Sequence, residues 1–108
     1  MGVEALIDVF LEAVAIMADL ELEQSGQSPL DRREALQRYS YQVTAAENIA
    51  TAIRKGVDEP LIVIENEIDN ARVMCDLPFI TLHDGVFDAH LEIALLARSI
   101  AKDFFEYA

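Results

Sequence analysis

Apolar side chains recur every three or four residues in four stretches of the chain, separated by short segments that contain Gly or Pro. Spacing of this kind gathers apolar side chains on one side of an α-helix. It predicts helices near residues 3–22, 29–55, 59–76 and 84–106. Short connections favour antiparallel neighbours. The pattern therefore predicts an all-α fold, a single four-helix bundle-like domain over residues 1–108.

The last of these stretches, residues 86–105, carries the broadest apolar arc. An arc wider than a surface helix requires predicts contact with two or more neighbours. We expect this helix to be the most buried of the four. One polar residue, His90, falls inside the arc. We expect its imidazole to be buried and neutral, bonded to a polar group such as the hydroxyl of Tyr39 or Tyr41.

Capping signals mark the ends of the first two helices. Gly26 suits the left-handed residue that ends a helix, and Ser28 followed by Pro29 suits the start of the next. Gly56 is expected to end the second helix. The stripe predicted for the first helix consists of Leu6, Phe10, Ala13, Met17 and Leu20, widened by Val3, Ile7, Val14 and Ala18. The stripe predicted for the second consists of Ala35, Leu36, Tyr39, Val43, Ala46, Ile49, Ala50 and Ile53.

The third helix is expected to start at Asp58-Glu59-Pro60. A strand over 61–64 is the alternative, because those residues are β-prone. Thr81 with Asp84 forms a possible capping box for the fourth helix; alternatively, Asp84 alone is the cap. The predicted seam of the third helix is Leu61, Ile64, Ile68, Ala71 and Cys75, with Cys75 as a small core residue. Three apolar residues lie off this seam: Ile62, Val73 and Leu77.

Charge is the unusual property of the composition. The chain has 20 acidic and 8 basic residues, a net charge of −12. Such a charge disfavours bare nucleic acid and anionic membranes as direct partners and favours a protein with a basic surface. Five of the bases lie in the second helix, which we expect to face an acidic neighbour within the fold: Arg32, Arg33, Arg38, Arg54 and Lys55.

Acidic residues form ridges on the first and third predicted helices. These ridges are either solvated faces that keep an apolar protein soluble or the surface that meets a basic partner. The candidate partner-binding residues are Glu4, Asp8, Glu12, Asp19, Glu65, Asp69 and Asp76.

No complete catalytic, cofactor-binding or metal motif is present. Di-iron bundles require Glu-x-x-His pairs, and neither His83 nor His90 has a Glu three residues before it. All-helical nucleotide pyrophosphohydrolases have about this length and acidity, but their Glu-Glu-x-x-Glu and Glu-x-x-Asp motifs are not matched. The nearest approach is Glu65, Glu67 and Asp69, with Asp8 and Glu12. The hydroxyls on the outer side of the second helix have no histidine in register: Ser40, Thr44 and Thr51.

The sequence thus favours a small acidic protein–protein interaction module, non-catalytic and regulatory or structural, which self-associates as a dimer. A DNA-mimic inhibitor of a basic nucleic-acid-binding protein is the first alternative, and a metal-dependent nucleotide hydrolase is the second. The N-terminal stretch has an acidic flank rather than the basic flank of a signal peptide. A single cysteine and the lack of a long uncharged apolar run favour a cytoplasmic protein without a membrane partner.

Overall fold

Four helices make up the fold. The computed structural model describes residues 2–25, 28–56, 59–76 and 84–107. The helices are α1 (Val3–Glu23), α2 (Pro29–Lys55), α3 (Pro60–Asp76) and α4 (Asp84–Tyr107). The all-α, bundle-like prediction is confirmed, with bounds close to those expected. The alternative of a strand over residues 61–64 is wrong, because these residues lie within α3.

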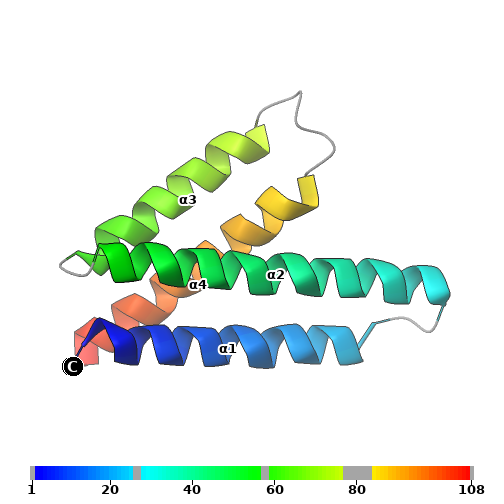
Figure 1. Ribbon diagram of the computed structural model, residues 1–108, viewed down its shortest axis with the longest axis horizontal. Coiled ribbons are helices and arrows are strands. Elements are labelled where there is room, and N and C mark those ends of the chain that lie inside the picture. Colours follow the sequence, from blue (N-terminus) through cyan, green and yellow to red (C-terminus); the bar gives the residue numbers. More distant parts are fainter. Residues whose placement is uncertain (1, 26–27, 57–58, 77–83, 108) are drawn as a thin grey trace.

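The helices form two antiparallel hairpins that cross each other (Figure 1). α1 and α2 lie side by side, and α4 passes behind α2 on its way to the N-terminal part of α1. α3 packs mainly against α4 and to a lesser extent against α2. The molecule measures 45 × 32 × 19 Å, and its shortest dimension is about two helix diameters. Two crossed layers leave each hairpin with one side open to solvent.

Local sequence sets the helix ends. The hydroxyl of Ser28 accepts a hydrogen bond from the backbone N–H of Asp31 at 3.0 Å, as expected of an N-cap before Pro29. α2 ends at Gly56, which has a φ of −105° and so does not use the left-handed region. A Cβ on Gly56 would lie 2.3 Å from a methyl group of Val63, so close packing requires the glycine. The expected roles of Gly26, Asp58 and Thr81 lie outside the described residues.

The core lies where the hairpins cross. α1 contributes Leu6, Ile7, Phe10 and Val14, all buried. α4 contributes small side chains, which let it approach α1 and α2 closely: Ala89, Ala94, Ala97 and Ala101. As predicted, α4 has the smallest share of exposed residues among the described parts of the helices, and it contacts all three other helices.

Three expectations about side-chain burial are wrong. Leu20 and Leu36 are 49% and 51% exposed, because they lie at the edges of their stripes. Cys75 is half-buried at the rim of α3 rather than in the core, and its Sγ donates to Oδ1 of Asp88 at 3.4 Å. Off the α3 seam, Ile62 and Val73 are exposed as expected, whereas Leu77 is outside the described residues.

Candidate functional site

Three of the seven candidate partner-binding acids have partners within the fold. Glu4 accepts a hydrogen bond from Arg54 at 3.2 Å, and Glu65 accepts one from Arg98 at 3.5 Å. Asp19 is hydrogen-bonded to the hydroxyl of Tyr39. This bond, with the charge of Asp19 and a small burial effect, raises the pKa of Tyr39. The pair of Glu4 and Arg54 confirms the expected contact between α2 and an acidic neighbour, but both side chains are largely exposed and the pair stabilises little.

The other four acids are exposed: Asp8, Glu12, Asp69 and Asp76. Asp8 and Glu12 lie one helical turn apart on α1, which has no basic residue. Within the described residues, neither carboxylate has a hydrogen bond or an ion pair to another side chain. They are therefore available to a cationic group outside the chain. α1 and α3 are not in close contact, so the two predicted ridges do not merge through a shared helix interface.

An exposed apolar row accompanies the acids on α1. Val9, Ile16 and Leu20 are 47%, 55% and 49% exposed. At roughly 100° per residue these three side chains fall within about 40° of one another. Asp8, Glu12 and Asp19 fall in an arc centred about 80° away. The outer side of α1 thus carries an apolar row beside an acidic row; we call the six residues together the α1 face.

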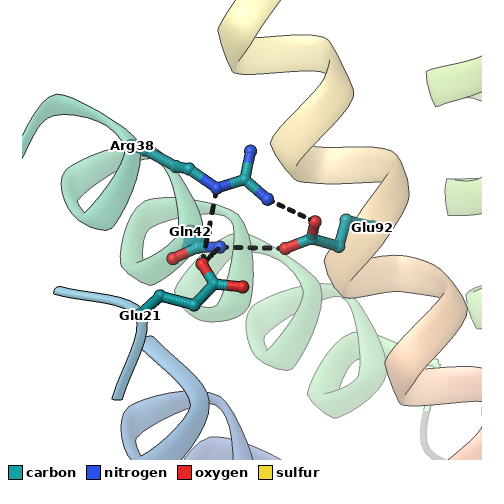
Figure 2. Close-up of polar contacts among 4 residues, drawn as sticks. All are labelled: Glu21, Arg38, Gln42 and Glu92. Carbon is teal, nitrogen blue, oxygen red and sulfur yellow. Dashed lines mark hydrogen bonds and ion pairs between the residues drawn. The ribbon is translucent and has the colours of Figure 1, made fainter. Parts of the chain in front are cut away.

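A polar cluster links α1, α2 and α4 where the hairpins cross (Figure 2). The amide of Gln42, 1% exposed, donates to Glu21 at 2.8 Å and to Glu92 at 2.9 Å. Arg38 donates to the same two carboxylates. Burial opposes the charge on Arg38, but Glu92 and Glu21 outweigh that effect and raise its pKa. The two carboxylates accept from both the buried amide of Gln42 and the guanidinium of Arg38, so the cluster ties α1, α2 and α4 together at the crossing.

Helical periodicity did not identify this cluster. The helical pattern of α2 places Gln42 beside the apolar residues Ala45, Ala46 and Ile49, and a glutamine flanked by core positions is the one available signal. Two partners come from helices that lie 21 and 50 residues away in the chain. Only the crossing of the hairpins brings them together.

His90 lines a groove of about 290 Å³ between α2 and α4. Its Nε2 is 2.9 Å from Oε2 of Glu67. The prediction of a buried imidazole bonded to Tyr39 or Tyr41 is therefore wrong: the side chain is 21% exposed and faces a carboxylate of α3. Tyr41 lines the same groove, and its hydroxyl accepts instead from Gln37 at 2.8 Å.

The groove brings two of the α2 hydroxyls, which were expected to have no histidine in register, to the same surface as a histidine. Ser40 and Thr44 line it together with His90. Neither hydroxyl is hydrogen-bonded to the imidazole, as a nucleophile activated by a base would be. The arrangement offers hydrogen-bonding groups without an assembled catalytic pair.

Metal ligands do not gather in the described parts of the chain, where no group of three His, Cys, Asp or Glu side chains is placed to hold an ion. Two of the acidic residues considered as magnesium ligands bind different partners: Glu65 pairs with Arg98 and Glu67 with His90. His83 is outside the described residues. Over the same described ranges, no helix has both the length and the apolarity to cross a membrane.

A second groove, of about 320 Å³, is almost wholly apolar and lies where the start of α3 meets the end of α4. Its walls include Pro60, Leu61, Ile62 and Phe105, and Glu59 is the one charged residue among the described residues that line it. Ile62 is 54% exposed and Phe105 is 40% exposed, and the Phe105 ring packs edge-on against Phe104. An exposed apolar surface of this kind is typical of a protein–protein contact.

Comparison of the chain with protein-family models, curated proteins and solved structures finds no match.

Proposed function

We propose that this protein acts by contact, as a non-catalytic regulatory or structural module whose acidic α1 face binds a basic surface of a partner protein. One observation carries the proposal: Asp8 and Glu12 are exposed on a helix that has no basic residue, and no described side chain neutralises them. The net charge of −12 adds a long-range field of the same sign. Electrostatic association of this kind is fast and weakens with salt.

Capture of partners from the native host at low and high salt tests the proposal. The double variant Asp8→Asn/Glu12→Gln removes two charges from the α1 face while leaving the pair between Glu4 and Arg54 in place. We expect it to lose salt-sensitive partners and to fold as well as the wild type, because repulsion along α1 is relieved. Glu34→Gln/Asp103→Asn is the matched control, since both acids are exposed on other helices.

The control variant distinguishes an effect of where the removed charges lie from an effect of the total charge. Retention of every partner by the Asp8→Asn/Glu12→Gln variant would make the α1 acids a solvated face and would refute the proposal. Equal losses in both variants would show that net charge, and no particular surface, governs capture.

We also propose that two copies associate through the apolar groove between α3 and α4. Among the described residues that line the groove only Glu59 is charged, so two copies of a chain of net charge −12 are expected to repel each other weakly there. The radius of gyration, 14.6 Å, exceeds the roughly 13 Å typical of a compact chain of this length, in keeping with a surface left for a partner. Light scattering is expected to report a dimer that Ile62→Gln/Phe105→Gln converts to monomer. A wild-type monomer of 12.0 kDa at high concentration would refute this.

A further inference from the structure

The exposed apolar row of α1 has the spacing of a helix–helix seam. Val9, Ala13, Ile16 and Leu20 follow one another at intervals of four, three and four residues, the repeat by which two helices pack along a line. Three of the four side chains are about half exposed, and Ala13 is partly buried. The row extends over about 16 Å at 1.5 Å per residue. α1 therefore has a second seam besides the one that it packs into the core.

The two flanks of this seam differ. On one flank lie Phe10, which is buried, and Met17, which packs against the core. On the other lie Glu12 and Asp19, at the positions that in paired helices select the partner by charge. A helix laid on the seam would thus meet the body of the protein on one side and a row of carboxylates on the other.

From this geometry we infer that the partner element is an amphipathic α-helix with apolar residues at three- and four-residue spacing and Lys or Arg along one flank. The inference rests on the proposed function and names the class of partner for the α1 face. A purely basic groove, of the kind that binds nucleic acid, would meet the acids but leave the apolar seam in water. A second copy of α1 is a poor occupant, because α1 has no basic residue to set against Glu12 and Asp19.

Three synthetic peptides of about 20 residues test this inference by fluorescence anisotropy against the intact protein. The first has Leu and Ile at seam spacing with Lys on the flanks. The second has the same composition with the spacing shuffled, and the third has Glu in place of Lys. We expect the first peptide to bind about tenfold or more tightly than the second, because only it buries the seam. The acidic peptide is expected not to bind.

Substitutions on α1 test whether the preference for the first peptide over the shuffled one arises from the apolar seam. Ile16→Gln/Leu20→Gln keeps every charge and is expected to abolish the preference for the first peptide over the shuffled one. Asp8→Asn/Glu12→Gln is expected to lower the affinity for both basic peptides and to reduce the dependence on salt. Val73→Gln, at an exposed apolar residue on α3 outside the apolar groove, is the control and should leave both dissociation constants unchanged. Circular dichroism melts verify that each variant is folded.

The outcomes separate the inference from the proposed function. Equal binding of the two basic peptides, or a preference that survives Ile16→Gln/Leu20→Gln, overturns the helical partner. In either case, weaker binding by Asp8→Asn/Glu12→Gln leaves the acidic contact surface standing. If the basic peptides bind no better than the acidic one, both proposals fall.

Discussion

Gln42 offers the most direct test of the hairpin crossing, because one buried amide connects three helices there. Its Nε2 donates to Glu21 at 2.8 Å and to Glu92 at 2.9 Å. Two substitutions of similar volume probe it: Gln42→Leu removes the donor, and Gln42→Glu replaces the donor with a third carboxylate.

The expected magnitudes differ for a physical reason. A hydrogen bond to a charged group contributes roughly 1.5–3 kcal/mol. The carboxylates of Glu21 and Glu92 are 42% and 37% exposed and stay partly solvated, so the two bonds together are discounted to about 2 kcal/mol. Burial of a leucine offsets part of that loss, and Gln42→Leu should lower the free energy of unfolding by about 1–2 kcal/mol. Gln42→Glu loses the same bonds and adds repulsion, for a loss of about 3–5 kcal/mol at pH 7.

The stability of the Gln42→Glu variant should depend on pH. Burial and the charges of Glu21 and Glu92 raise the pKa of the carboxyl group introduced by Gln42→Glu above its unfolded value. Its proton is therefore bound more tightly in the folded state, and stability is recovered as pH falls toward the unfolded pKa. Between pH 7 and pH 5 the difference between the two variants should shrink.

Urea unfolding followed by circular dichroism measures both variants against the wild type at each pH. Against a total stability of about 5–15 kcal/mol, a loss of 3–5 kcal/mol is readily resolved. If Gln42→Glu and Gln42→Leu are equally stable at pH 7 and stay so at pH 5, the amide is not held between two carboxylates, and our account of the crossing is wrong.

Two further predictions concern single contacts. Asp19→Asn should lower the pKa of Tyr39, because the hydrogen bond and the charge that raise it are weakened. NMR titration of the ring measures this pKa, and an unchanged tyrosine pKa would contradict the contact. By linkage, the contact stabilises the fold below about pH 10, and this stabilisation is lost as pH rises through the raised pKa. Gly56→Ala should destabilise the fold by about 1–3 kcal/mol, because the added methyl group meets Val63. Adding Val63→Ala should recover part of the loss made by Gly56→Ala, and thermal melts that show additive losses would exclude the clash.

The sequence by itself determined the helices. Ser28 before Pro29, Gly56 after Lys55 and the spacing of Ile64, Ile68 and Ala71 are local signals, since capping and helical periodicity involve residues three or four apart. For the same reason the acids of α1 were identified as exposed before the fold was known. Periodicity finds the apolar side of a helix, but it does not say which helix covers that side.

The tertiary structure decided how each face is used. Leu20 and Leu36 belong to their stripes by periodicity, yet both are exposed. Gln42 is polar by composition, yet it is buried because α4 brings Glu92 over it. His90 faces Glu67 only because α3 and α4 pack antiparallel. These contacts join residues distant in the chain. The one between Gln42 and Glu92 depends on how the two hairpins cross, and the one between His90 and Glu67 depends on how α3 and α4 pack within their hairpin.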